Sequence, residues 1–451
     1  MKPEQPKRKE VLKSFLEKFD IATLNPMQTE ARKAIYAGND VAVLSPTGSG
    51  KTLAFLLPII ERLDAEVSEV QALVLVPSRE LAMQIEQVAR KLGSGHKINA
   101  VYGGRSGALD KADLKHRPAL LIGTPGRIAD RFRRDEMDLS RIKTLVLDEF
   151  DKSLEVGFER EMSEIVRSLG AVEQRVLTSA TAAVAIPKFL GLHDPITIDY
   201  LNQHRPQLTV KTIASPAGKQ LDTLRSTVDA LKGQPGIIFC NFKESLHEVS
   251  DYLFDHAIEH ECFYGGLEQI DRERALVKFR NGTCQLLLAT DLAARGLDIP
   301  EIKFIIHFEL PYHSNEFTHR NGRTARMNAE GAAYVLHTTG KRLPEFIKAS
   351  DPEVQSLEAL RAAKIKNIEA WSTLYITGGR QDKISKGDIA GMFFKIGGLN
   401  KDELGIIELQ QNCAFVAVKR TIAHRVIEKT NNQRLRRKRY GLHSYVDPTP
   451  L

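Results

Sequence analysis

The chain is poor in cysteine and has no long apolar run. Its 451 residues include four cysteines, and no two of them form a Cys-x-x-Cys pair. A disulfide framework and a structural zinc site are therefore excluded, and a reducing compartment is favoured. No apolar stretch approaches the roughly 18 residues of a membrane span, and residues 1–13 lack the apolar segment of a signal peptide. These absences predict a soluble, cytoplasmic protein.

The positive charge of the chain is small and concentrated at one end. The net charge is +7, from 64 Lys and Arg against 57 Asp and Glu. Residues 367–451 contain 14 Lys or Arg and 8 Asp or Glu, which is a difference of +6. The total alone does not identify a nucleic-acid-binding protein, but the tail holds nearly all of the excess.

Short apolar runs alternate with helical patterns through the first 340 residues. This alternation predicts an α/β fold with two tandem parallel-sheet domains, at residues 1–204 and 221–366. A stretch rich in Pro, Ser and Lys, at residues 205–220, is predicted to be a linker. The expected strands are 41–44, 72–76, 119–122, 144–147 and 176–177, then 236–239, 262–264, 286–288, 304–307 and 333–336.

The tail, residues 367–451, has a different pattern. Strands are expected at 374–377, 405–409, 414–418 and 442–446, with helices at 386–395 and 421–431. This β-α-β-β-α-β order predicts a small α+β domain. Residues 434–439 add five cations in six positions.

The sharpest local motif is Ser-Pro-Thr-Gly-Ser-Gly-Lys-Thr at residues 45–52, between an expected strand and an expected helix. In such a loop the backbone N–H groups bind phosphates at a helix N-terminus, Lys51 reaches the outer phosphates, and the Thr52 hydroxyl binds magnesium. The predicted nucleotide-binding residues here are Thr47, Gly48, Ser49, Gly50, Lys51 and Thr52.

An acidic motif, Asp-Glu-Phe-Asp at residues 148–151, follows the expected strand 144–147. Asp148 could hold magnesium beside the phosphate loop, and Glu149 could deprotonate the attacking water. Such an acidic run is otherwise a solvated loop entrance. Polar motifs at 77–82, 124–127 and 179–181 also follow strands, and ligands bind at the carboxyl edge of a parallel sheet. This coincidence favours the site.

Eight ordered blocks between residues 20 and 340 resemble those of the DEAD-box ATP-dependent RNA helicases. Besides the phosphate loop they include Pro-Ser-Arg-Glu-Leu-Ala (77–82), Gly-Gly (103–104), Thr-Pro-Gly-Arg (124–127), Asp-Glu-Phe-Asp (148–151), Ser-Ala-Thr (179–181), Ala-Thr-Asp-Leu-Ala-Ala-Arg-Gly-Leu-Asp (289–298) and His-Arg-Asn-Gly-Arg-Thr-Ala-Arg (319–326). The resemblance implies two RecA-like domains that hydrolyse ATP when RNA is bound.

The resemblance also assigns roles around ATP. Gln28 would contact the adenine edge, Asp298 the ribose, and Arg323 and Arg326 would act as arginine fingers. Lys51, Asp148 and Glu149 keep the roles argued above. Four residues would couple nucleotide state to domain closure: Asp151, Ser179, Thr181 and His319.

A track for the RNA backbone is implied in the same way. Its expected residues are Arg79, Gly104, Thr124 and Arg127 in the first domain and Gln269, Arg272 and Thr290 in the second. Contacts to the backbone carry no base information. For each arginine the alternative is a surface salt bridge.

Four positions depart from the family pattern. Ile21 stands where an aromatic residue usually stacks on adenine, and Phe150 stands where the family has Ala. Asn321 and Ala325 replace the usual Ile and Gly. None of these departures removes a catalytic group, but Phe150 needs room near residues 179–181 and His319.

The tail resembles the RNA-recognition-motif-like domain that ends the DbpA type of bacterial ribosomal-RNA helicase, over about 75 residues. The aromatic side chains of Tyr375 and Phe415 could stack on RNA bases, or they could be core residues. Arg436 and Arg437, within the basic run, would contact phosphates.

Together these patterns predict a monomeric, magnesium-dependent, RNA-stimulated ATPase. Its expected role is to unwind short duplexes in ribosomal RNA while the large ribosomal subunit assembles. Two alternatives remain open: an ATP-gated RNA clamp or annealing factor, and a passive RNA-binding module with a vestigial motor.

Overall fold

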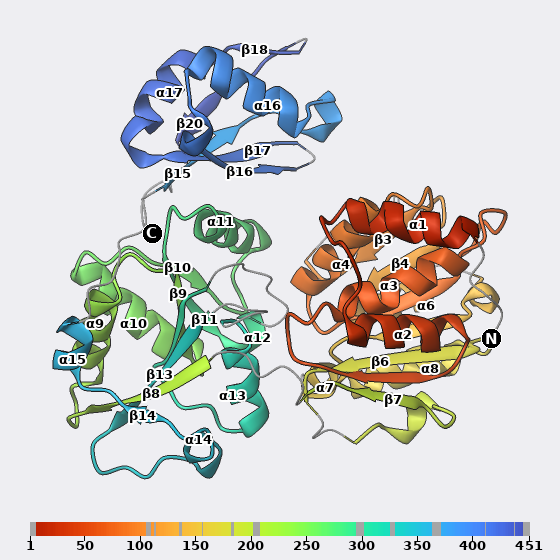
Figure 1. Cartoon of the computed structure of the whole chain (residues 1–451), viewed down its shortest axis with the longest axis horizontal. Helices are drawn as coiled ribbons and strands as arrows, with labels where there is room; N and C mark the ends of the chain where they lie inside the picture. The colour runs from red at the N-terminus through yellow and green to blue at the C-terminus, as the bar shows by residue number, and fades with distance from the viewer. Residues whose placement is uncertain are drawn as a thin grey trace. The chain divides into compact units, whose positions relative to one another are not determined.

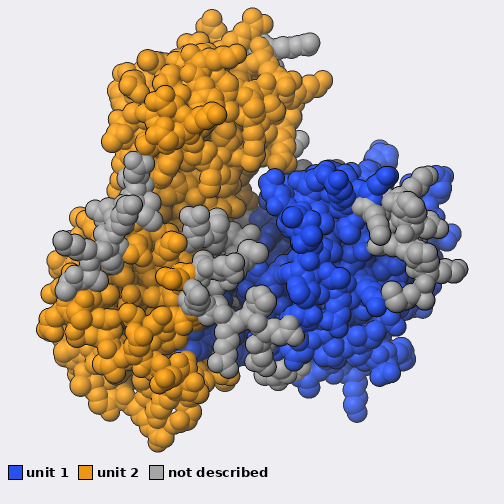
Figure 2. Space-filling model, in the orientation of Figure 1, with its two compact units in different colours: residues 1–207, 295–298, 315–329 blue, residues 208–294, 299–314, 330–451 orange. Residues whose placement is uncertain are grey.

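A computed structural model describes residues 6–104, 110–111, 114–134, 138–155, 157–181, 185–201, 208–294, 302–324, 330–362, 371–410, 412–436 and 438–444. The chain divides into two compact units (Figure 2). Unit 1 contains residues 1–207 with segments 295–298 and 315–329, and unit 2 contains the rest. Asp298, Arg326 and Arg437, together with Ala325, lie outside the described residues.

Unit 1 contains a seven-stranded parallel sheet with the order β3-β4-β2-β5-β6-β1-β7. Its strands are β1 (Val41–Leu44), β2 (Ala72–Leu75), β3 (Ile98–Val101), β4 (Leu120–Gly123), β5 (Thr144–Leu147), β6 (Gln174–Ser179) and β7 (Ile196–Asp199). Its helices include α1 (Pro6–Glu17), α2 (Pro26–Tyr36), α3 (Lys51–Arg62), α4 (Arg79–Leu92), α6 (Pro125–Arg134), α7 (Phe150–Glu155) and α8 (Glu159–Ser168). The predicted parallel sheet is confirmed, and β3 and β7 extend it.

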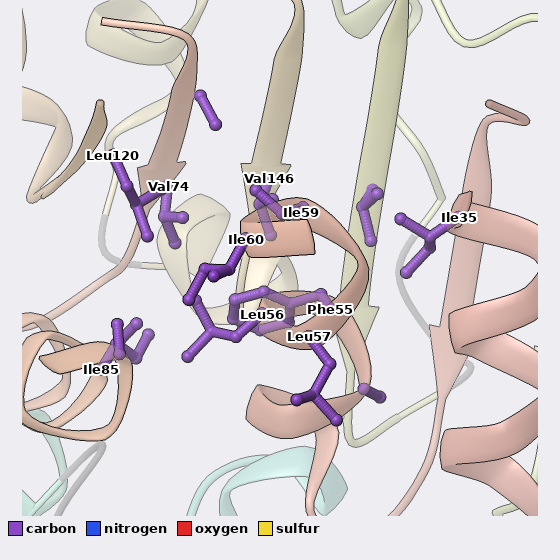
Figure 3. Close-up of a cluster of buried hydrophobic side chains, with 14 of the residues drawn as sticks. Ile35, Phe55, Leu56, Leu57, Ile59, Ile60, Val74, Ile85, Leu120 and Val146 are labelled. Carbon is purple, nitrogen blue, oxygen red and sulfur yellow. The ribbon is translucent and has the colours of Figure 1, made fainter. Parts of the chain in front are cut away.

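One face of this sheet is covered by α3, which is apolar almost all round. Phe55, Leu56 and Ile59 are fully or nearly fully buried, and they belong to the same cluster as Val74 and Val146 of the sheet (Figure 3). Removing such side chains from water is the main favourable term in folding. The packing fixes the start of α3, and therefore the phosphate loop, at the carboxyl edge of the sheet.

Unit 2 begins with a second seven-stranded sheet, ordered β10-β11-β9-β12-β13-β8-β14. Its strands are β8 (Leu208–Ser215), β9 (Gly236–Cys240), β10 (Glu261–Phe263), β11 (Leu286–Thr290), β12 (Phe304–His307), β13 (Gly331–Thr338) and β14 (Glu353–Val354). Its helices include α9 (Gln220–Ala230), α10 (Lys243–Asp255), α11 (Gln269–Arg280), α12 (Asp291–Ala294), α14 (Glu345–Lys348) and α15 (Leu357–Ala362), and α13 (Ser314–Asn321) follows β12 in the chain.

The predicted linker at 205–220 is wrong over half of its length. Residues 208–215 form β8, which pairs with β13 along its whole length and with β14 on its other side. Polar residues alternate with apolar ones in this strand because it lies near the sheet edge and is only half buried. That mixture of residues resembled a linker in the sequence.

The tail forms a four-stranded antiparallel sheet ordered β16-β17-β15-β20, with two helices over one face (Figure 1). The strands are β15 (Trp371–Ile376), β16 (Leu404–Leu409), β17 (Ala414–Lys419) and β20 (Leu442–Ser444), and the helices are α16 (Lys386–Met392) and α17 (Ala423–Thr430). The predicted β-α-β-β-α-β order is confirmed. The basic run forms a small hairpin of β18 (Arg434–Leu435) and β19 (Lys438–Arg439).

No helix in the described part of the chain is both long enough and apolar enough to cross a membrane.

Candidate active site

The phosphate loop lies between β1 and α3. Gly48 and Gly50 have φ angles of 84° and 87°, in the left-handed region that glycine adopts without strain. Lys51 folds back over the loop, and its Nζ donates to the carbonyl oxygens of Ser45 at 2.6 Å and Pro46 at 3.0 Å. Burial lowers the pKa of Lys51, although nearby carboxylates oppose this effect. The loop can thus receive phosphates, with a cation held at its centre.

Gln28 connects α2 to this loop. Its Nε2 donates to the Gly50 carbonyl oxygen at 3.2 Å, and its Oε1 accepts from the backbone N–H of Asn25 at 3.0 Å. Asn25 in turn donates from Nδ2 to the carbonyl oxygen of Ser49 at 3.0 Å. A Cβ at Gly50 would lie 2.3 Å from Gln28 Nε2, so only glycine permits this approach. The residue expected to contact adenine therefore also positions the phosphate loop.

The acidic motif follows β5, and Thr178 of β6 organises it. The Thr178 hydroxyl donates to the Asp148 carboxylate and accepts from the backbone N–H of Glu149. Burial, together with the charge of Glu149, raises the pKa of Asp148 to about 6. Sequence reasoning missed Thr178. The pairing of the two strands would have indicated it: Leu147 of β5 pairs with Leu177 of β6, so the residues that follow them, Asp148 and Thr178, are also neighbours.

Glu149 is buried and faces positive charge. Its backbone φ is 51°, which a non-glycine residue rarely adopts and which indicates local strain. Its Oε2 lies 3.4 Å from the Nζ of Lys152, whose side chain is completely buried. Burial alone would raise the pKa of Glu149, but the charges of Lys152 and Arg323 lower it to about 2. Glu149 is therefore ionised at neutral pH and able to accept a proton. Lys152, one helical turn later, is a second residue that sequence reasoning missed.

The four expected coupling residues meet around Asp151. The Thr181 hydroxyl donates to Asp151 Oδ2 at 3.1 Å, and His319 Nε2 lies 3.4 Å from the same oxygen. The Ser179 hydroxyl donates to the Thr181 carbonyl oxygen at 2.7 Å. Burial, and then the charge of Lys152, lowers the pKa of His319 to about 4, so this imidazole is neutral at pH 7. The end of α13 also reaches the phosphate loop, because a Cβ at Gly322 would lie 3.2 Å from Thr47.

Phe150 packs in the hydrophobic core of unit 1. It is 3% exposed and belongs to a hydrophobic cluster that also contains Leu147, Met162 and Ile165. The larger ring is therefore accommodated by the core, while its neighbours Glu149 and Asp151 keep the contacts described above.

Among the described residues, no three His, Cys, Asp or Glu side chains form a cluster able to hold a metal ion. Magnesium commonly keeps several waters and binds through one or two carboxylates and substrate phosphates. One carboxylate, Asp148, next to a phosphate loop that carries the Thr52 hydroxyl, fits that pattern.

Family models match three parts of the chain. The DEAD/DEAH box helicase model matches residues 25–189, the helicase conserved C-terminal domain model matches 219–328, and the DbpA RNA-binding domain model matches 373–443. The chain is 32% identical over 432 residues to the ATP-dependent RNA helicase DbpA of Escherichia coli, with 94% of each chain covered. It is 30% identical to the DbpA helicase of Bacillus subtilis, over 84% of this chain and 86% of the relative.

The chain belongs to the DEAD-box ATP-dependent RNA helicases. Its combination of domains is that of the DbpA type, and its activity is that of an RNA-stimulated ATPase. The fold agrees with that of a solved helicase, S. cerevisiae Dbp5 bound to RNA and ADP BeF3, at a TM-score of 0.68 and 24% identity, covering 81% of this chain and 93% of the other. Membership of this family makes the chain an ATP-binding protein, and its DbpA RNA-binding domain makes RNA its partner.

In unit 1 of the helicase, the expected RNA track runs along the loops that follow β2, β3 and β4. A Cβ at Gly104 would lie 2.4 Å from the Nη1 of Arg79, so this guanidinium lies directly on Gly104. Thr124 precedes α6, the helix that begins at Pro125. Arg127 Nη2 lies 2.6 Å from Oδ2 of the fully buried Asp110, so this arginine is held by a largely buried ion pair and not by the surface salt bridge considered as the alternative.

In unit 2 the expected track residues belong to α11 and to the end of β11. Arg272 is 7% exposed, and its guanidinium lies over the ring of Phe263 at 4.8 Å. Gln269 is the first residue of α11, and its side chain lies outside the described part of the structure. Thr290 ends β11 and is buried.

The tail residues separate into two groups. Phe415 is 5% exposed, and its ring centroid lies 5.5 Å from that of the half-buried Tyr375. This burial favours the interpretation of the aromatic pair as packing residues. Arg436, in contrast, is about half exposed and pairs with Asp388 across 2.8 Å. The hairpin therefore offers the more accessible cationic group.

Proposed function

We propose that this helicase separates short RNA duplexes and that its target is ribosomal RNA during assembly of the large ribosomal subunit, in the cytoplasm and as a monomer. The observation that carries this proposal is the presence, in one chain, of the buried side chains of Gln28, Lys51, Asp148, Glu149 and Arg323 and of a DbpA-type RNA-binding domain.

The proposed cycle begins with nucleotide binding in unit 1. Gln28 contacts the adenine edge, and the residues from Thr47 to Thr52 hold the phosphates. Thr52 and Asp148 would hold magnesium, largely through water, and the bound ion would supply positive charge beside the phosphates. Ile21 supplies apolar contact where an aromatic ring would stack.

Glu149 then orients the attacking water and accepts its proton. Arg323 and Arg326 stabilise the charge that develops on the transferred phosphate, a role worth about 10³ to 10⁵ in rate in related enzymes. Asp298 contacts the ribose. The group around Asp151, with Ser179, Thr181 and His319, links the nucleotide state to the RNA track.

The track side chains bind the RNA backbone and bend one strand. Each base-pair step contributes roughly 1.4 kcal/mol if DNA values transfer, so a distortion over a few pairs is enough to open a short duplex. Hydrolysis then restores the open state. Because these contacts carry no base information, the tail provides the preference for one RNA.

The clamp alternative rests on the expectation that Phe150 slows ATP turnover, and the burial of this ring among Leu147, Met162 and Ile165 argues against that expectation. A passive module is disfavoured by the arrangement of Lys51, Glu149 and Arg323.

The test compares ATP turnover of the full chain with that of a chain ending at Lys366, each with ribosomal and with random RNA of equal length. We expect both proteins to respond to RNA, and only the full chain to prefer ribosomal RNA. Measurement of strand separation on a short duplex gives the second readout. If the two proteins show the same ratio of turnover with ribosomal RNA to turnover with random RNA, the tail does not direct the helicase to ribosomal RNA. ATP turnover without strand separation would favour the clamp.

A further inference from the structure

The outer face of the tail sheet is covered, although no helix of the tail lies on it. In β15, Leu374 and Ile376 point into the tail core, so Thr373 and Tyr375 point to the opposite face. On that face Thr373 is 1% exposed, and Phe415 and Ala417 of β17 are 5% and 1% exposed. An open sheet face would leave such residues accessible to water.

The C-terminal end of α11, in the second helicase domain, supplies the covering groups. Asn281 Nδ2 donates to the Thr373 hydroxyl at 3.1 Å, and the hydroxyls of Thr283 and Thr373 are 2.7 Å apart. The amide nitrogen of Asn281 and the hydroxyls of Thr283 and Thr373 are thus bonded across the contact, while Asn281 Oδ1 is buried without a hydrogen-bond partner among the described residues. Leaving a buried polar group unpaired is costly, so the two bonds that do form here specify how the segments meet.

Ion pairs border this polar centre. Arg280 Nε lies 3.2 Å from Oε1 of Glu408 on β16, and their side chains are 33% and 20% exposed. Burial raises the pKa of Glu408, and the charge of Arg280 opposes this effect. On another side, Arg420 Nη2 donates to the Thr283 carbonyl oxygen at 2.9 Å and to Glu259 at 3.2 Å.

Trp371 fills the gap between the two domains. A Cβ at Gly282 would lie 3.2 Å from the indole Cδ1, and a Cβ at Gly405 would lie 3.0 Å from its Cζ3. The indole is therefore held between two glycines, one in the turn after α11 and one in β16. Gly282 has a φ of 72°, so the turn also needs glycine for its backbone conformation.

We infer that the outer sheet face of the tail is an intramolecular docking surface for the end of α11, and that Thr373, Glu408 and Trp371 serve this contact instead of RNA. Stacking of bases on Tyr375 and Phe415 would then require α11 to leave. RNA held by the tail would contact other surfaces, such as the basic hairpin. Because α11 begins at the expected track residues Gln269 and Arg272, the docked tail is joined to the track through one helix.

The single tryptophan of the chain makes the contact measurable in the full-length protein without RNA. Acrylamide quenching of Trp371 fluorescence should be weak in the wild type. In Arg280→Glu it should rise by about twofold, because two carboxylates then face each other in a half-buried position. The double variant Arg280→Glu/Glu408→Arg should restore weak quenching, which a tail that merely fails to fold would not do.

Arg425→Glu is the matched control, since it makes the same charge change at an exposed position of α17. It should leave quenching at the wild-type value. Equal quenching in the wild type and Arg280→Glu, or no recovery in the double variant, would overturn the inference. So would an increase in wild-type quenching on addition of single-stranded RNA, because RNA would then displace α11. The quenching measurements made without RNA test only the contact between the tail and α11, so their result does not depend on the proposed ribosomal target.

Discussion

Restoring the alanine that the family usually has at position 150 should destabilise this protein. Phe150 is 3% exposed and lies in the cluster formed by β5, α8 and neighbouring strands, with Leu147, Met162 and Ile165. Replacement of a buried Phe by Ala costs about 3–5 kcal/mol, from lost burial and from the cavity that remains. We therefore expect Phe150→Ala to lower the free energy of unfolding of unit 1 by about this amount.

The catalytic groups should keep their positions in Phe150→Ala. Thr178 still holds the backbone of Glu149, and Thr181 still donates to Asp151. ATP turnover per folded molecule, measured at a temperature where the variant remains folded, should therefore stay close to the wild-type rate.

Urea unfolding followed by far-ultraviolet circular dichroism, together with hydrogen exchange of peptides covering β5 and β6, measures the effect. The exchange data are needed because a chain with two units does not have to unfold in one step. Phe254→Ala is the control, since this ring is 65% exposed and surface changes usually stay within about 0.5 kcal/mol. A loss below about 1 kcal/mol for Phe150→Ala would refute the packing described here. A change in turnover without a change in stability would instead place the ring in the coupling machinery.

Four further outcomes are expected. Glu149→Gln should abolish ATP turnover while ATP-dependent RNA binding persists, and hydrolysis at the wild-type rate would exclude Glu149 as the base. Arg323→Ala should leave nucleotide binding by the first helicase domain, residues 1–204, intact but remove RNA-stimulated turnover in the full chain; an unchanged stimulated kcat would contradict the arginine-finger role. Thr178→Val should lower stability by about 1–3 kcal/mol, because it leaves buried partners unsatisfied, and should also reduce turnover; a variant with wild-type melting would argue against the observed bonds. Cys240 and Cys284 are buried, and burial raises the pKa of Cys284 to about 12, so neither should react with a thiol reagent at pH 8 until the protein unfolds, as thiol titration with and without urea can show.

The parallel-sheet architecture was predictable because buried parallel strands are short, continuous apolar runs. The order of elements in the tail was predictable for a similar reason. The spacing of its apolar residues changes between the period of a strand and the period of a helix. β8 was mistaken for a linker because a half-buried strand mixes polar and apolar residues, and its pairing with β13 joins segments that are far apart in sequence.

The candidate site was predictable where its groups are local in sequence, as in the phosphate loop and the acidic motif. Thr178 and Lys152 were missed for different reasons. Thr178 acts through the register of two strands, and Lys152 became a partner of Glu149 only because both side chains are buried together. Side chains alternate between the two faces of β15, so the sequence places Tyr375 on the face opposite to Leu374 and Ile376. No pattern within the tail indicates which segment covers that face.

The strand order of unit 1 has a consequence for synthesis of the chain. β1 lies between β6 and β7, so its two neighbours are made more than a hundred residues after it. Contacts between such distant segments form slowly, and unpaired apolar strands expose a nascent chain to aggregation. The phosphate loop follows β1 directly, and the backbone N–H of Ser45 donates to the Ser179 carbonyl oxygen at 3.0 Å. This contact of the loop cannot form until β6 has left the ribosome, so the nucleotide site is completed late in the synthesis of unit 1.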